Sequence, residues 1–307
     1  MRRLLALAAS MACGAALAQP QPLTVCVAAD NPPLSHLVNG QPRGLDLRIA
    51  QAAADSLGRP LKVLPFETEY EKESSLAHEV AALLSAGVCD AASGFPLLTG
   101  EFGPPTRPSA RTPGYPGAKR KRERPYITLQ AMAPGRAYLS AALGAVLPAG
   151  AAPLDKLGDL GDRKMGVTSG TLAGTVAMGW KFGTLRKQLV SLNQREAPLD
   201  ELARPVSGAT PRFDAVMLPL ALFDGWRMQH PGASLVAAGW RRSIGVNLGF
   251  VTLQSDTAVR PAIDAVIARA LADGSLQRWA GEEGVTWSPP VQPDVGRGPN
   301  LLELMTD

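Results

Sequence analysis

Residues 23–66 have the sequence LTVCVAADNPPLSHLVNGQPRGLDLRIAQAAADSLGRPLKVLPF, in which two short apolar runs flank one segment of helical periodicity. The apolar runs at 23–28 and 60–66 are predicted to be strands, and Asp30-Asn31-Pro32-Pro33 ends the first of them. Between the runs, segment 44–58 repeats its apolar residues at helical spacing, and Gly58 with Pro60 ends this helix. The stretch therefore predicts a strand–helix–strand unit.

The same alternation continues along the chain. A helix over 69–86 closed by Gly87 and a strand over 88–95 extend the first series. Alternating strands and helices are typical of a parallel sheet with right-handed crossovers, which places the protein in the α/β class. A second series is predicted beyond residue 125, with strands at 126–133, 164–168, 188–192, 213–217, 234–237 and 244–253, and helices at 171–180, 199–203, 219–228, 257–272 and 275–283.

The N-terminus has the composition of a secretory signal peptide. Arg2 and Arg3 precede an apolar run over 4–17, and Ala16-Leu17-Ala18 provides a small-residue cleavage site before Gln19. The apolar run is too short for a membrane span. Residues 1–18 are therefore predicted to be a signal peptide, and the mature protein is expected in the periplasm. Lipidation of Cys13 is the alternative.

Two cysteines remain after the predicted cleavage. Cys26 and Cys89 can form only one pair, and export places them in an oxidising compartment, so we expect a disulfide between them. Two buried free thiols are the alternative.

Composition narrows the functional classes. Hydrophobic residues make up 46% of the chain, as in a globular protein, and cleavage of the signal peptide lowers the formal net charge from +4 to +2. A nearly neutral chain argues against nucleic-acid binding. The three histidines show no metal-ligand spacing, and no cofactor is expected. Segment 166–170 reads GVTSG, which is not a nucleophile elbow, and no P-loop lysine occurs. We therefore predict a non-catalytic protein.

Several motifs, in this order and spacing, resemble the family 3 periplasmic solute-binding proteins of ABC importers. The motifs are LTVCVAADNPPLS at 23–35, GLDLRIAQAAADSLG at 44–58, LLSAGVCDAASGFPLLTG at 83–100, RPYITLQAM at 124–132, LDKLGDLGDRKMGVTSGT at 154–171, FDAVMLP at 213–219 and DGSLQRW at 273–279. The resemblance implies a periplasmic-binding-protein type II fold, with two α/β lobes joined by two hinge strands. Lobe I would comprise 19–131 and 247–290, and lobe II 132–246. Residues 291–307 would form a Pro/Gly-rich tail to which no structure is assigned.

The family resemblance also implies a function. A monomer would capture a small solute in the interlobe cleft and deliver it to an ABC-transporter permease in the inner membrane. Ligands of α/β sheets lie at the carboxyl ends of strands, and helix N-termini offer free N–H groups to anions. The expected ligand-binding residues are Asn31, Ser93, Phe95 and Thr99 in lobe I, and Ser169 and Thr171 in lobe II. Asp46 is expected to be a solvated residue on a helix face.

Departures from the family pattern bear on the ligand. Amino-acid binders hold the ligand carboxylate with an arginine just after the lobe I threonine, where this chain has Thr99-Gly100-Glu101-Phe102. They hold the ammonium with an aspartate five residues beyond the Asp of the Asp-Ala-Val motif, which is Pro219 here. Arg107 and Arg111 are possible replacements from the long loop. We therefore expect a small polar or anionic solute other than a standard amino acid.

Two alternatives to a transport role stay open. The cysteine in the first strand and the Gly-x-Cys-Asp motif also resemble the solute-binding-like accessory proteins of periplasmic quinoprotein (methanol) dehydrogenases, so such a dehydrogenase is the alternative partner. These relatives carry a Trp- and Arg-rich stretch where this chain has FETEYEKESSLAHE at 66–79. Some relatives of the fold are periplasmic lyases, and an acid near Thr99, such as Glu101, would favour that activity.

The loop at 100–124 is rich in Pro, Gly and Arg and is predicted to lie on the surface. Its end is strongly basic, with Lys119, Arg120, Lys121, Arg122 and Arg124. A solvated loop is the expected interpretation. Contact with an acidic partner or an anionic membrane surface is the alternative.

Overall fold

In the computed structural model, which describes residues 20–69, 75–204 and 210–306, one mixed sheet of eight strands runs through the molecule in the order β11-β10-β12-β9-β13-β6-β1-β5. The predicted signal peptide lies outside the described residues. Within these three ranges, no helix has the length and apolar character that a membrane crossing requires.

The first half of the sheet comes from the stretch that opens the predicted α/β series. β1 (Leu23–Ala28) pairs in parallel with both β5 (Leu61–Phe66) and β6 (Ala91–Pro96). The connecting helices are α1 (Leu45–Ser56) and α2 (Leu76–Ser85). α2 is shorter than predicted because Ser75 caps it: the Ser75 side chain accepts a hydrogen bond from the backbone of His78, whose ring accepts one from the Ser75 N–H.

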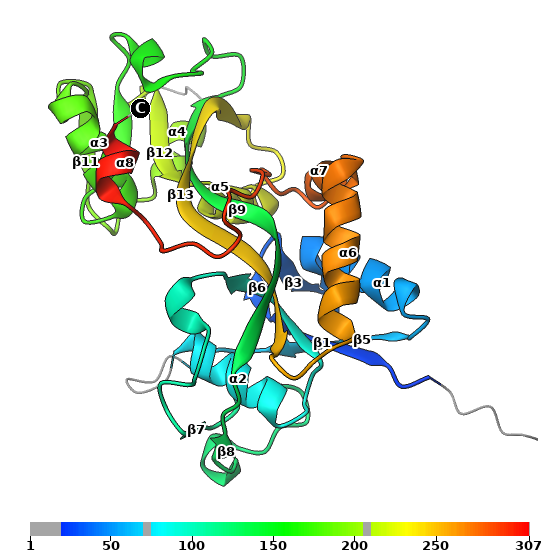
Figure 1. Ribbon diagram of the computed structural model, residues 1–307. Helices are drawn as coiled ribbons and strands as arrows, with labels where there is room; N and C mark the ends of the chain where they lie inside the picture. Colours follow the sequence, from blue (N-terminus) through cyan, green and yellow to red (C-terminus); the bar gives the residue numbers. More distant parts are fainter. Residues whose placement is uncertain (1–19, 70–74, 205–209, 307) are drawn as a thin grey trace, which may run out of the picture.

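Two long antiparallel strands join the halves of the sheet (Figure 1). β9 (Met132–Pro148) has 17 residues and β13 (Leu235–Leu253) has 19. Their pairing extends from Leu253–Met132, at the end near β6, to Leu235–Pro148, at the end near β12. The sequence predicted shorter strands here, at 126–133, 234–237 and 244–253. Gly144, Gly245 and Gly249 interrupt the apolar pattern. Gly144 and Gly249 are nevertheless paired with a strand on each side, whereas Gly245 lies in an irregularity of the pairing between Ser243 and Asn247.

The second half of the sheet contains β10 (Met165–Thr168), β11 (Leu189–Leu192) and β12 (Ala215–Pro219). The three strands are mutually parallel around β10. The helices of this half are α3 (Leu172–Gly183), α4 (Pro198–Ala203) and α5 (Leu220–Gln229). Pro219, which was predicted to lie in the first turn of a helix, ends β12 and occupies the N-cap position of α5.

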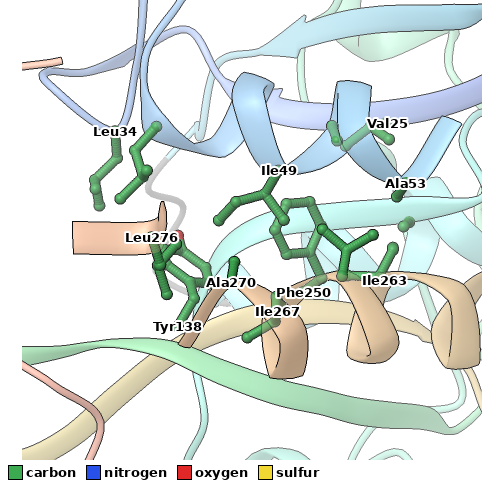
Figure 2. Close-up of a cluster of buried hydrophobic side chains, with 14 of the residues drawn as sticks. Val25, Leu34, Ile49, Ala53, Tyr138, Phe250, Ile263, Ile267, Ala270 and Leu276 are labelled. Atoms are coloured by element: carbon green, nitrogen blue, oxygen red, sulfur yellow. The ribbon is translucent and has the colours of Figure 1, made fainter. Parts of the chain in front are cut away.

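Separate apolar cores lie against the two halves. In the first half, α1 and α6 (Val259–Ala272) bury Ile49, Ile263 and Ile267 against Val25 and Phe250 of the sheet (Figure 2). α7 (Ser275–Glu282) adds Leu276 to this core. The second half has its own cluster, which includes Leu143, Met165, Val176, Met217 and Trp240. Burial of these side chains is the main source of stability in each half.

Cys26 of β1 and Cys89, just before β6, form the disulfide expected from the sequence. Their Cα atoms are 5.8 Å apart, within the usual range for a disulfide. Both residues are buried in a third apolar cluster, which also contains Val80 and Leu83 of α2.

The remaining strands form two small antiparallel sheets. The first contains β2 (Asp30–Asn31), β3 (Ser35–Val38) and β4 (Gln41–Arg43), and the second contains β7 (Ser109–Ala110) and β8 (Ile127–Thr128). β7 lies within the loop at 100–124, and β8 follows the basic end of this loop.

The basic loop at 100–124 was predicted to be solvated, but two of its basic residues contact the first half. Arg124 is buried, and its guanidinium forms an ion pair with Glu69 and donates to the Thr112 carbonyl. Lys121 lies 3.1 Å from the other carboxylate oxygen of Glu69. These two cations anchor the loop to the first half, because a buried guanidinium needs an opposite charge and acceptors.

The C-terminal residues 286–306, here called the C-terminal strap, cross both halves, although the sequence prediction assigned no structure to residues 291–307. The strap leaves α7, passes over β13 and ends in α8 (Leu301–Met305), which lies against α3 (Figure 1). Asn247 of β13 holds it in the middle: its amide donates to the carbonyls of Val291 and Asp294 at 2.7 and 2.9 Å and accepts from the Val291 N–H at 3.1 Å.

Further contacts tie the strap to each half. In the first half, the Gly296 carbonyl accepts from the Thr99 N–H at 2.9 Å. In the second half, the carboxylate of Asp224 on α5 accepts from the Thr286 backbone N–H at 2.6 Å and from its hydroxyl. Arg242 donates to the carbonyl of Glu303 at 2.7 Å. The strap is therefore a further connection between the two halves beside β9 and β13.

Leu304 is the apolar anchor of the strap, since it is 5% exposed within the core of the second half. We expect Leu304→Ala to weaken the docking of α8 by about 2 kcal/mol, the lower end of the cost of truncating a buried leucine. Hydrogen exchange of the α8 amides would then accelerate about 30-fold. Leu302 lies on the same helix but is 71% exposed, so Leu302→Ala is the matched control. Equal exchange rates in the two variants would contradict this prediction.

Candidate functional site

A cavity of about 400 Å³ lies at the carboxyl ends of β10 and β12 in the second half of the sheet. Thr168 ends β10, and Met217 to Pro219 end β12. The start of α3, the segment 197–200 at the start of α4, and one side of α5 complete the wall. The carboxyl edge of parallel strands is where open α/β sheets bind ligands, and the volume falls within the roughly 300–1,000 Å³ of small-molecule sites.

The wall of the cavity is mainly apolar and carries a small polar cluster. Trp226 of α5 donates a hydrogen bond from Nε1 to Oδ1 of Asp200 at 2.7 Å. His230, one turn later, stacks on the Trp226 ring with 4.2 Å between the centroids. Its Nε2 lies 3.8 Å from the same Asp200 oxygen. The pattern Trp-x-x-x-His on a helix is the sequence signal that could have located this cluster, because residues four apart share a helix face.

Asp200 is the only charged residue among the described residues that line this cavity. Its side chain is 48% exposed, so its carboxylate is accessible to a ligand. Of the described residues, neither Arg107 nor Arg111 lines the cavity, although both were considered as ligand partners. Arg111 lies in the first half, where its guanidinium stacks 4.4 Å from the ring centroid of Tyr126.

The two site residues predicted in the second half lie at and beside the cavity. Thr171 lines it as the N-cap of α3, where its hydroxyl accepts from the Gly174 N–H at 3.1 Å and donates to the Thr168 carbonyl at 2.7 Å. Ser169 bonds instead to the Ser191 hydroxyl at 2.5 Å. Thr171 therefore has a structural role in capping the helix in addition to its place in the wall.

The four residues predicted in the first half are not brought together with this cavity. Ser93 is buried and donates to Asp46 at 2.7 Å, and Phe95 is 2% exposed in a core cluster with its ring centroid 6.0 Å from that of Phe102. Thr99 is exposed beside the strap. Asn31 lines a separate cavity of about 80 Å³ between the halves, which Pro219 also borders. Ligand contacts by these residues stay predictions.

Asp46 differs from its expected solvated position. It is fully buried at the start of α1, where its carboxylate accepts hydrogen bonds from the hydroxyls of Ser93 at 2.7 Å and Tyr138 at 2.5 Å. Burial raises the pKa of Asp46 to about 6, although the two hydrogen bonds act in the opposite direction. The residue joins α1 to β6 and β9. A helix-face aspartate is usually solvated, and only the tertiary neighbours distinguish this case.

Across residues 20–69, 75–204 and 210–306, no group of three or more His, Cys, Asp or Glu side chains could hold a metal ion. Asp200 and Trp226 line the cavity at the carboxyl ends of β10 and β12, which makes the acid–aromatic cluster the candidate site.

No protein-family model matches this chain, and no curated protein matches it. Solved structures do match. One is the second substrate-binding domain of a putative amino-acid ABC transporter from Streptococcus pneumoniae, with a TM-score of 0.58, 14% identity, and coverage of 85% of this chain and 98% of that domain. Another is substrate-binding domain 2 of GlnP from Lactococcus lactis in an open conformation, with a TM-score of 0.59, 14% identity, and coverage of 86% and 95%. These similarities show the fold: the chain has the periplasmic-binding-protein type II α/β fold, as predicted.

A third structure corrects the prediction of a non-catalytic protein. An ancestral cyclohexadienyl dehydratase matches with a TM-score of 0.58 and 16% identity, over 86% of this chain and 92% of the dehydratase. The prediction is overturned because this fold carries an enzyme as well as binding domains, so missing nucleophile and phosphate-loop motifs do not exclude catalysis.

Proposed function

We propose that this protein is a periplasmic solute-binding protein that captures a small solute for an ABC importer, with the inner-membrane permease as its partner. The observation that carries the proposal is the cavity at the carboxyl ends of β10 and β12 in a type II fold. The substrate-binding domains among the structural neighbours support this role. The halves of the sheet would act as the lobes, with 19–131 and 247–290 in one and 132–246 in the other.

A ligand screen of the purified, oxidised protein tests the proposal. Amines, organic acids, amino acids and sugars are added singly, and the melting temperature is recorded. We expect at least one class to stabilise the protein, because a ligand at 100 times its dissociation constant adds about 2.7 kcal/mol. Stabilisation should disappear in Ala197→Trp, since Ala197 is exposed and lines the cavity. A library without any stabilising member, or hits that persist in this variant, would reject the proposal.

A lyase on the same fold is the second candidate function, favoured by the ancestral dehydratase among the structural neighbours. Glu101, the acid named from the sequence, lies beside a different cavity, with Phe102 and His78. Incubation with a prephenate-like acid, followed by mass spectrometry, separates the two functions. Conversion of the acid into an aromatic product with release of water and carbon dioxide indicates a lyase, whereas recovery of every hit unchanged indicates a binding protein.

A further inference from the structure

We infer that the cavity at β10 and β12 takes a monocationic amine with a compact apolar body, bound through Asp200 and Trp226. This inference rests on the proposed function, because it names the ligand class of the same site. The sequence predicted a polar or anionic solute, and the cavity wall favours the opposite charge.

The apolar body of the ligand follows from the wall. Ala173, Leu199, Met217, Leu218 and Leu222 line the cavity, and Leu222 is 63% exposed at its rim. Such a surface gains by covering apolar groups and offers few hydrogen bonds to a sugar or a polyol. The hydroxyl of Thr171 is engaged in capping α3.

The positive charge follows from Asp200. Its Oδ1 is held by the Trp226 indole N–H at 2.7 Å, which fixes the carboxylate at the wall. In the described part of the chain, no lysine or arginine lines the cavity to neutralise this charge. An ammonium group would supply both the opposite charge and hydrogen-bond donors, whereas a carboxylate or phosphate would be repelled.

Trp226 gives the same preference independently of Asp200. His230 stacks on one face of the indole ring with 4.2 Å between the centroids, and Trp226 lines the cavity, so a ligand in the cavity meets this ring. The face of an indole ring attracts cations more strongly than that of any other side chain. A ligand with its ammonium near Asp200 and its apolar body on the wall can therefore interact favourably with both Asp200 and Trp226.

Three probes with the same phenylethyl body and different charge test the inference. We would measure binding of 2-phenylethylamine, 3-phenylpropanoate and 2-phenylethanol to the full oxidised protein by titration calorimetry. We expect the amine to bind at least 10-fold more tightly than the other two. Asp200→Asn should weaken the amine about 10- to 100-fold, the usual range for one charged hydrogen-bond partner, and change the alcohol less than 3-fold. Asp162, exposed and outside the cavity wall, provides the control variant Asp162→Asn.

The possible outcomes separate the ligand class from the proposed function. If the carboxylate or the alcohol binds more tightly than the amine, the inferred ligand class is wrong. If this binding is lost in Ala197→Trp, the cavity is still the binding site. No binding of the amine would overturn the inference, and the wider ligand screen then decides the proposed function. If Asp200→Asn fails to fold, Trp226→Phe removes the N–H that holds Asp200 and keeps an aromatic ring. Unchanged amine affinity in Trp226→Phe would also contradict the inference.

Discussion

Replacing both Cys26 and Cys89 with alanine is expected to lower the free energy of unfolding by about 4 kcal/mol. The disulfide joins residues that are 63 positions apart, and a crosslink over a loop of this length restricts the unfolded chain by about that amount. Alanine is preferred to serine because both positions are buried, and a serine hydroxyl there would add the cost of an unpaired polar group.

The measurement is urea unfolding of the two proteins, each with and without a strong reductant. The native protein should lose stability when reduced, whereas the double-alanine variant should be insensitive to the reductant. This difference separates the crosslink from the loss of sulfur atoms in the core. A variant within 1 kcal/mol of the oxidised native protein would contradict the loop argument.

The sequence predicted the elements that depend on local pattern. Segment 44–58 became α1 because its apolar spacing, Gly44 and Gly58 agree with the packing of Ile49 and Ala53 in the core. The long strands β9 and β13 were predicted only in part. Their continuity depends on pairing with each other and with β12 and β6, which are distant in the sequence. The strap could not be predicted for the same reason, because Asn247 forms hydrogen bonds with residues more than 40 positions away in the sequence.

The candidate site was predicted less well than the fold. Thr171 was found because it follows a strand and caps a helix, which is a local pattern. Asp200 and Trp226 lie 26 residues apart, and their hydrogen bond exists only because α4 and α5 are placed beside the same strand ends. The family pattern directed attention to positions 99–102 and 219, where this chain lacks the charged groups of amino-acid binders. The charge that faces the cavity comes from a different helix.

The native protein is expected to lose stability as the pH rises from about 4 to about 7, because Asp46 then ionises. The variant Asp46→Asn has no carboxyl at this position and should not show this loss. The folded carboxyl has a pKa of about 6, compared with an ordinary value of 3.8. The folded state therefore binds the proton more tightly than the unfolded state. This contribution is fully present below pH 3.8 and is lost as the pH rises through 6. The difference between the two pKa values corresponds to about 3 kcal/mol.

Asparagine is a neutral group of nearly the same shape, and its amide can still bond to the hydroxyls of Ser93 and Tyr138. The free energy of unfolding of both proteins is measured in urea at pH 4, 5, 6 and 7.5. Between the lowest and the highest pH, the variant should gain about 3 kcal/mol relative to the native protein. Asp224 and Asp264, whose pKa values are also raised by burial, titrate equally in both proteins, so their effects cancel. A difference that does not change with pH would mean that Asp46 is not the group responsible.

Tyr138→Phe tests the same pair from the other side. The Tyr138 hydroxyl donates to Oδ1 of Asp46, and this hydrogen bond lowers the pKa of the carboxyl against the effect of burial. Without it, the ionised carboxylate has one donor fewer, and the pKa of Asp46 should rise further. Tyr138→Phe should therefore destabilise the protein more at pH 7.5 than at pH 4, whereas a residue that contributes only packing would show the same loss at both.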